Sequence, residues 1–246
     1  MTRSLPERLD LAAGTDVGLR RSVNQDEAAV LTGEDGSFAL LLVCDGIGGL
    51  ARGDVASRTV VHAVTLGMAE CAGVPIACLR RAIEDAHRAI NEESSLWERM
   101  GTTVVAVLCT DSGVEVLHAG DSRAYLFRHG ALEGLTTDHS WVMERVQAGL
   151  MTVEEAEQDS RRNIITRAVG TEEELRLERT SLGPLLPGDI VMACTDGLHG
   201  PVPRAVMEEV LRGSANARGA VDGLIAAANE RGGPDNVGIA LGVMTG

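Results

Sequence analysis

The apolar run FALLLVC at residues 38–44 constrains this chain more than any other feature, because it ends abruptly in Asp45-Gly46. The run is long enough for one buried strand and too short for a comfortable helix. A carboxylate at the end of a buried strand costs free energy unless a cation meets it. Glycine lets the backbone turn tightly and lets a ligand approach closely. From this stretch alone, Asp45 is interpreted equally well as a metal ligand and as an ordinary turn residue.

The pairing of an apolar run with an aspartate recurs along the chain. Asp196-Gly197 follows DIVMACT, Asp121 follows EVLHAG, and Asp26 and Asp235 stand just before apolar runs. Five carboxylates that converged at one end of a sheet would repel each other unless cations lay between them. The chemistry of this set is all hard oxygen, which favours Mg²⁺ or Mn²⁺ over zinc.

A pair of such ions has a use in the hydrolysis of phosphate esters. It lowers the pKa of a bridging water, so that hydroxide exists near neutral pH, and it screens the charge of a phosphate during an in-line displacement. Arg21 is close in sequence to Asp26, and its planar guanidinium suits bidentate contacts with phosphate oxygens. The alternative for Arg20 and Arg21 is a solvated turn, and the short spacing to Asp26 favours a function for one of them.

The composition narrows the partners and the compartment. The formal net charge of −14 argues against nucleic acid or an anionic membrane as the main partner. No apolar run approaches the length of a membrane span, and the N-terminus has no apolar signal segment, so we expect a cytoplasmic protein. The five cysteines show no CxxC spacing, and we interpret them as free, small hydrophobic residues in a reducing cytosol.

Strands come in runs and helices come in pairs. Apolar periodicity predicts helices at 51–71 and 76–94 and at 204–211 and 218–228. A helical, acidic stretch is expected at 139–160, with Gly149 breaking it. This order predicts an α+β sandwich of antiparallel sheets with helices on their outer faces, and the absence of a βαβ alternation argues against a doubly wound parallel sheet. No linker or repeat interrupts the order, so we expect residues 1–246 to form one domain. The predicted strands cover residues 8–18, 27–33, 38–44, 102–110, 114–120, 124–130, 131–136, 164–182, 189–194 and 236–244.

Seven stretches of the chain resemble, in their order, the metal-dependent protein phosphatase family (PPM, type 2C) in its compact bacterial form. They begin near Thr15 and end in the last strand, so the resemblance covers nearly the whole chain. A single Asp-Gly is a weak signal, whereas seven motifs in order are very specific. The resemblance implies a four-layer αββα sandwich with two antiparallel sheets and a metal centre at one end of them. The stretches are TDVGLRRSVNQDEA, LLVCDGIGGLARGDVAS, GTTVVAVL, VLHAGDSRAYLFRHGALEGLTTDHSWV, NIITRAVG, PGDIVMACTDGL and GGPDNVGIALG.

The resemblance also implies roles for residues that match the family's motifs. Asp45 resembles the carboxylate that bridges the two core metals, and the carbonyl of Gly46 resembles a ligand of one of them. Asp196 and Asp235 resemble ligands of the other. Asp121 is similar to the residue that, with Asp196, binds a third metal in bacterial members.

Three further matches concern the outer part of the site. Asp26 resembles the outer acidic residue that holds a metal directly or through water. Arg21 matches the arginine that clamps the substrate phosphate. Residues 140–163, the flap, correspond to a mobile segment that is thought to shape substrate access in this family.

The chain departs from the family pattern at a few positions. Gln25 stands where many bacterial members have Glu, which should weaken a water-mediated metal contact. Many members have Met at the position of Ile47 and His at that of Leu50, and eukaryotic members often have His at the position of Ile47, so this loop offers no proton donor. Asp159-Ser160 replaces a common His-Pro at the end of the flap.

Residues around these motifs receive structural interpretations. His139 follows Asp138 in the TDHS motif, where we expect a structural hydrogen bond in preference to catalysis. Asn236 is expected to orient the loop that holds Asp235. Thr102 and Thr103 open a core strand and are interpreted as packing residues.

The resemblance implies a metal-dependent protein serine/threonine phosphatase, in which metal-activated water attacks the phosphoryl group of phosphoserine or phosphothreonine proteins. The expected cofactors are two core Mn²⁺ or Mg²⁺ ions, with a third in the manner of bacterial members. The expected partners are phosphorylated proteins, such as products of a cognate serine/threonine kinase. One alternative is a pseudophosphatase or regulatory phosphoprotein-binding module without turnover, for which Gln25 is the only hint. Another is a phosphatase that acts on one specific regulator.

Overall fold

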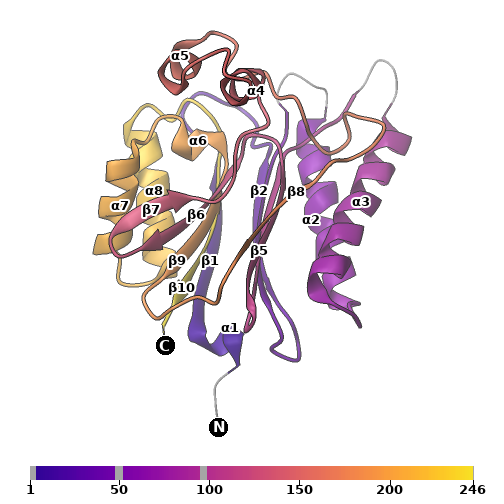
Figure 1. Ribbon diagram of the computed structural model, residues 1–246, viewed down its shortest axis with the longest axis vertical. Coiled ribbons are helices and arrows are strands. Elements are labelled where there is room, and N and C mark those ends of the chain that lie inside the picture. The colour runs from indigo at the N-terminus through magenta and orange to yellow at the C-terminus, as the bar shows by residue number, and fades with distance from the viewer. Residues whose placement is uncertain (1–3, 48–51, 95–98, 246) are drawn as a thin grey trace.

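Two antiparallel sheets lie face to face in the computed structural model, with helices on both outer faces (Figure 1). The structure describes residues 4–47, 52–94 and 99–245. The predicted four-layer α+β sandwich is therefore confirmed. Helix α1 lies at one end of the sandwich, and the short helices α4, α5 and α6 lie at the opposite end (Figure 1).

Each sheet contains five strands within the described ranges. The first has the order β1-β10-β9-β6-β7 and the second the order β2-β3-β4-β5-β8, and every neighbouring pair is antiparallel. In the first sheet the C-terminal strand β10 lies between β1 and β9, so this sheet is complete only when the end of the chain has paired. The strands are β1 (Leu9–Asp16), β2 (Asp26–Thr32), β3 (Ala39–Asp45), β4 (Val104–Thr110), β5 (Gly113–Ala119), β6 (Arg123–Arg128), β7 (Ala131–Gly134), β8 (Glu178–Leu182), β9 (Ile190–Cys194) and β10 (Val237–Met244).

Two helix pairs cover the sheets. Helices α2 and α3 pack on the second sheet, and α7 and α8 pack on the first (Figure 1). The predicted pairs are thus found at their predicted places, with ends that differ by a few residues. Among the helices that the structure describes, none is long and apolar enough to span a membrane. The helices are α1 (Leu5–Arg8), α2 (Gly53–Ala69), α3 (Pro75–Glu93), α4 (Trp141–Gln147), α5 (Val153–Gln158), α6 (Asp196–His199), α7 (Arg204–Gly213) and α8 (Ala217–Glu230).

Strand β3 explains why the opening apolar run shows no alternation with polar residues. Leu40, Leu42 and Cys44 face the core under α2 and α3, whereas Leu41 and Val43 face the core between the sheets. All five are fully buried. Burial of a Leu or Val side chain stabilises the fold by about 1.5–3 kcal/mol, so this strand is firmly anchored along its whole length. Asp45, the last residue of β3, is therefore attached to a firmly packed strand.

One secondary-structure prediction needs correction. Only Glu178–Leu182 of the stretch 164–182 forms a strand, because the residues before it make single bridges, Thr102 to Val169 and Ser140 to Ile165, instead of a ladder. The helical stretch 139–160 is divided into α4 and α5 around Gly149, as predicted, and this glycine has a φ of 69°. A short helix, α6, begins two residues after the end of β9.

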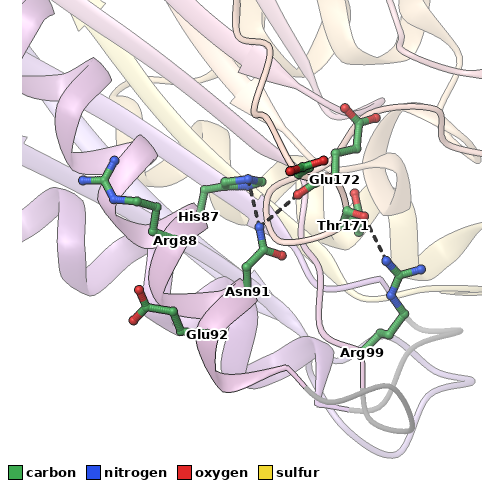
Figure 2. A pocket seen from close by; sticks show the side chains of 8 residues that line it. His87, Arg88, Asn91, Glu92, Arg99, Thr171 and Glu172 are labelled. Atoms are coloured by element: carbon green, nitrogen blue, oxygen red, sulfur yellow. Dashed lines mark hydrogen bonds between the residues drawn. The ribbon is translucent and has the colours of Figure 1, made fainter.

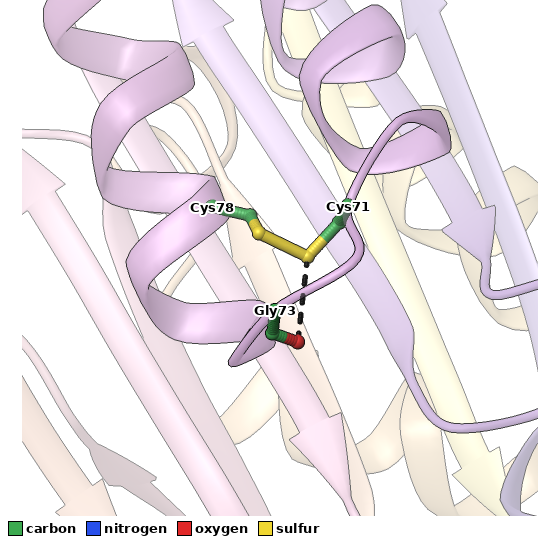
Figure 3. The surroundings of a disulfide bond; sticks show 3 residues. All are labelled: Cys71, Gly73 and Cys78. Atoms are coloured by element: carbon green, nitrogen blue, oxygen red, sulfur yellow. Dashed lines mark hydrogen bonds between the residues drawn. A yellow bond between two sulfur atoms is a disulfide. The ribbon is translucent and has the colours of Figure 1, made fainter.

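The interpretation of all five cysteines as free is wrong for two of them. Cys71 and Cys78 form a disulfide that joins the end of α2 to the first turn of α3, with 5.8 Å between their Cα atoms (Figure 3). Their separation of seven residues matches no motif, and only the antiparallel packing of the two helices brings them together. Cys44, Cys109 and Cys194 are free and buried, as expected.

The disulfide makes the stability of the oxidised protein depend on reductant. Cross-linking of a loop this short stabilises a fold by about 2–3 kcal/mol through the unfolded state. We expect thermal unfolding of the oxidised protein to occur at a lower temperature after addition of dithiothreitol. The Cys71→Ser/Cys78→Ser variant, as control, should unfold at one temperature with or without reductant. Detection of five free thiols in the unreduced, denatured protein would contradict this pairing.

Candidate metal centre

Asp26 and Asp45 face each other at one end of the second sheet. Asp26 is the first residue of β2 and Asp45 the last of β3, and the antiparallel register pairs them directly. Asp26 is buried, with 3% of its surface exposed. Two carboxylates opposite each other in a sheet are unfavourable as a pair of anions. The register itself therefore creates a strongly negative point at this edge.

Asp196 and Asp235 reach the same place from the first sheet. Asp196 begins α6 directly after β9, and Asp235 lies two residues before β10, which pairs with β9. The two segments approach so closely that a Cβ on Gly197 would lie 1.8 Å from the carbonyl oxygen of Asn236. Only glycine fits at position 197. In the Asp196-Gly197 pair the aspartate therefore supplies the carboxylate, and the glycine allows the close contact of the two backbones.

Asp121 comes from the loop between β5 and β6. It is 7% exposed, and its carbonyl oxygen lies 3.1 Å from Nε2 of His199 on α6. Burial lowers the pKa of His199 to about 3, so the ring is neutral and its Nε2–H donates to this carbonyl. The contact ties the Asp121 loop to the helix that begins with Asp196.

Each of the buried carboxylates responds to the charge of others in the group. Burial and then the charges of the other four aspartates raise the pKa of Asp45 well above its usual value. Burial raises the pKa of Asp26 to about 7, with contributions from Asp196 and Asp235. Burial followed by the charge of Asp196 raises the pKa of Asp121 to about 7, and burial followed by the charge of Asp235 raises that of Asp196 to about 6. The structure thus brings together the five aspartates singled out in the sequence.

The set fits hard divalent cations. Oδ1 of Asp121 is buried and has no hydrogen-bond partner among the described residues, which is costly for a carboxylate oxygen without a cation. The converging side chains offer carboxylate oxygens, the ligands that Mg²⁺ and Mn²⁺ prefer. Gly46 lies in the same edge, where its N–H donates to the carbonyl of Gln25 and a Cβ would meet the carbonyl of Gly53 at 2.4 Å.

Two threonines fix the backbone of Asp45, a role that the sequence analysis missed. Oγ1 of Thr102 donates to the carbonyl of Asp45, and Oγ1 of Thr103 accepts from its N–H at 3.0 Å. Both threonines are fully buried. Their interpretation as packing residues is therefore incomplete. The only signal for them in the sequence is a pair of hydroxyls at the start of an otherwise apolar strand.

Polar contacts also hold the neighbouring loops. Thr195 donates from Oγ1 to Oδ2 of Asp26 at 2.7 Å. Asn236 accepts from the N–H of Gln25 through Oδ1 and donates from Nδ2 to the carbonyl of Val17. The expectation that Asn236 orients its loop agrees with these bonds. Gln25 contributes through its backbone, which joins the Asn236 loop to that of Gly46.

Arg21 lies at the mouth of the aspartate group. Its Nη2 is 2.8 Å from Oδ2 of Asp235, and 43% of its side chain is exposed. Its charge also acts on Asp196, where it opposes the rise of the carboxyl pKa. A guanidinium that is close to the carboxylates and still open to solvent is suitably placed to meet an incoming anion.

Only some of the positions at which this chain departs from the family pattern lie within the described residues. Ile47 follows Gly46, and its N–H donates to the carbonyl of Gly101. Leu50 falls outside the residues that the structure describes. Asp159 forms a bidentate ion pair with Arg161 at the end of the flap, with distances of 2.9 and 2.7 Å. The aspartate in place of histidine thus has a local partner of its own.

A second group of potential metal ligands consists of His118, His139 and Glu178. The two imidazole rings are stacked, with centroids 4.5 Å apart and planes 5° apart. Ring nitrogens bind a metal in the plane of the ring, so two parallel, stacked rings do not suit one ion. Nδ1 of His139 instead accepts from the N–H of Gly120, and its Nε2 lies 3.1 Å from Glu178. The structural role expected for His139 fits these contacts.

A cavity of about 450 Å³ lies apart from the aspartate group, between α3 and the loop after Gly170 (Figure 2). Nδ1 of His87 accepts from the N–H of Gly170. Asn91 and Arg99 donate to carbonyls of the loop (Figure 2). These bonds use polar groups of three of the lining residues. None of the lining residues is one of the predicted site residues.

Comparison with known proteins places the chain among phosphatases. Residues 14–232 match the family model described as Protein phosphatase 2C. The "Serine/threonine phosphatase stp" of Listeria monocytogenes is 34% identical over 235 residues, which cover 92% of each chain. The structure of "Serine/threonine phosphatase Stp1 from Staphylococcus aureus" is similar with a TM-score of 0.90, at 28% identity and with 100% and 99% of the two chains covered. The catalytic domain of "serine threonine protein phosphatase PstP in complex with 2 Manganese ions" gives a TM-score of 0.79, at 33% identity and with 97% and 99% covered.

The raised carboxyl pKa values predict an unusual pH dependence for the protein in chelator. Between about pH 4 and 7 the folded state binds more protons than the unfolded chain, so the free energy of unfolding should fall as the pH rises. Asp45→Asn removes one of the repelling charges. It should therefore raise stability in EDTA at pH 8 by about 1 kcal/mol or more, since one pKa unit corresponds to about 1.4 kcal/mol.

Urea unfolding in EDTA at pH 5 and pH 8 measures this effect. The control is Asp222→Asn, an exposed position on α8 whose nearest cation is Arg218 at 3.7 Å. It should leave the pH dependence unchanged. A chelated wild-type protein that is equally stable at both pH values would show that the aspartates do not repel each other in the fold.

Proposed function

This chain belongs to the protein phosphatase 2C family, and we propose that its five converging aspartates hold the divalent ions of the reaction. The chain is a phosphoprotein phosphatase of the serine/threonine class, a hydrolase that depends on Mn²⁺ or Mg²⁺. The observation that carries the assignment of the site is the raised pKa of Asp45, on which burial and the charges of the other four aspartates all act. Five carboxylates gathered without cations would only destabilise the fold.

The proposed ligands follow the sequence motifs. Asp45 and the carbonyl of Gly46 would hold the two core ions together with Asp196 and Asp235. Asp121 with Asp196 would hold a third. When bound, the ions supply a water of lowered pKa and neutralise phosphate charge. Asp26, on the strand beside Asp45, completes the set.

The other residues of the site position the substrate. Arg21 binds the phosphate oxygens with its guanidinium and aligns the phosphorus over the carboxylates. Thr102 and Thr103 hold the backbone of Asp45 and so keep its carboxylate aimed at the same point. The side chain of Cys44 is fully buried in the core under α2 and α3, so it does not serve as a nucleophile. We therefore propose direct attack by water without a phosphoenzyme.

The binding-module alternative gains no support. All of the aspartates that hold ions in the proposed site are present and lie together, and the named relatives are phosphatases. Gln25, the one hint in its favour, acts through its backbone.

We propose that the substrates are phosphoserine and phosphothreonine proteins in a bacterial cytoplasm, formed by a cognate kinase, and that the protein acts in signal transduction. The names of the relatives and the absence of a spanning helix among the described residues support this setting. We also propose that residues 1–246 act as one catalytic domain with the flap at 140–163. A phosphatase that acts on one specific regulator would use the same catalytic core, and it differs from this proposal only in the range of its substrates.

Loss of one carboxylate should abolish turnover. Asp45→Asn and Asp196→Asn should each lower the hydrolysis of p-nitrophenyl phosphate in Mn²⁺ by more than about 100-fold. Residues that merely support metal ligands already contribute 10- to 100-fold, and a ligand should contribute more. Steady-state kinetics measure this, with Asp222→Asn as a control that keeps full activity. Wild-type rates in either site variant would overturn the assignment.

The neighbouring arginines offer a matched test of phosphate binding. Arg21→Lys keeps the charge but loses the planar fork, so kcat/KM should fall by about tenfold or more. Arg20→Lys makes the same change one residue earlier, at an exposed position, and should have little effect. Equal behaviour of the two variants would remove Arg21 from the site.

A further inference from the structure

The ring of Trp141 is held between two arginines at the base of the flap. The guanidinium carbon of Arg145 lies 4.1 Å from the ring centroid, and that of Arg161 lies 3.7 Å from it. Arg145 comes from the same short helix, α4, whereas Arg161 comes from the segment that returns after α5. The stack therefore joins the outgoing and the returning halves of the flap.

The partners of the two arginines differ. Arg161 is fixed by Asp159 through two hydrogen bonds, and Asp159 also accepts from the backbone N–H of Arg161. Nε of Arg145 is buried and has no acceptor in the part of the chain that the structure describes. The ring of Trp141 lies against this guanidinium and compensates part of its loss of water.

The base of the flap lies against the proposed metal centre. The N–H of Trp141 donates to the carbonyl of Ile164, and Ser140 bridges to Ile165, so the two ends of the flap meet there. One residue earlier, His139 donates from its N–H to the carbonyl of Gly120, which precedes Asp121. A short stretch of backbone and one hydrogen bond therefore connect Trp141 to the loop of Asp121.

The flap has few other anchors. Of its residues, Val142 and Ala156 are buried hydrophobic residues, whereas Leu150 and Val153 are 70% and 50% exposed. Helices as short as α4 and α5 are not stable by themselves. The direction of the flap consequently depends on the contacts at its base.

We propose that Trp141, with Arg145, Arg161 and Asp159, forms a latch that holds the flap in one orientation beside the site, and that Trp141 is a positioning residue for phosphoprotein substrates. The proposal rests on the phosphatase function proposed above. A protein substrate must pass the flap, whereas a small aryl phosphate needs only the carboxylate edge and Arg21. The latch should therefore change KM for the first kind of substrate and leave the second unchanged.

Kinetics with two substrates test the latch. Trp141→Leu should raise KM for a phosphothreonine peptide by about tenfold with little change in kcat, since it removes two cation–π contacts. Arg161→Met removes one of them and should raise this KM by about threefold. Both variants should hydrolyse p-nitrophenyl phosphate in Mn²⁺ as the wild type does. Arg162→Met is the matched control, because it removes the same charge from an exposed neighbour.

A second readout is independent of turnover. The chain contains two tryptophans, so Trp97→Phe leaves Trp141 as the sole reporter. In that background Arg161→Met and Asp159→Asn should shift the emission of Trp141 and speed amide hydrogen exchange in residues 142–163, and Arg162→Met should do neither. Equal emission and exchange in Arg161→Met and Arg162→Met, or an unchanged peptide KM in Trp141→Leu, would overturn the latch. If the wild-type protein did not hydrolyse p-nitrophenyl phosphate in Mn²⁺, the proposed function would be overturned. The emission test of the latch would still be valid.

Discussion

Repulsion among buried carboxylates is the constraint on which the rest of this structure depends. The antiparallel register places Asp26 opposite Asp45, and the pairing of β9 with β10 brings Asp196 and Asp235 to the same edge. Folding the chain therefore forces like charges together, and burial and this repulsion raise the pKa values of Asp26, Asp45 and Asp196. The cost must be offset elsewhere, and the fully buried strands behind the aspartates supply large hydrophobic stabilisation.

The same constraint explains where the polar contacts of the interior lie. Thr102 and Thr103 hold the backbone of Asp45, and Thr195 donates to Asp26. A carboxylate held by its backbone cannot turn away from its neighbours to relieve the repulsion. Rigid support thus maintains an arrangement that is unfavourable for the protein alone and suited to cations, and stability is exchanged for function at this edge.

The sequence predicted those parts of the molecule that are determined locally. Apolar runs that end in aspartate marked both the strands and the residues that converge, as with Asp45 and Asp196. Features that depend on distant contacts escaped prediction. The disulfide between Cys71 and Cys78 needs the packing of two helices. The residues before β8 have strand-like composition but find only single bridges. The support that Thr103 gives to Asp45 spans 58 residues of chain and leaves no local signal.

The net charge of −14 is at first sight unsuited to a protein that binds phosphate esters. Charges farther apart than about 8 Å are largely screened at physiological ionic strength. The global charge therefore has little effect on a bound phosphate, and the groups within a few ångströms decide its affinity. Arg21, held by Asp235 and exposed at the mouth of the site, is such a group. Because recognition is this local, selection among phosphoproteins must come from surfaces next to the site, and the flap lies there, joined through His139 to the loop of Asp121.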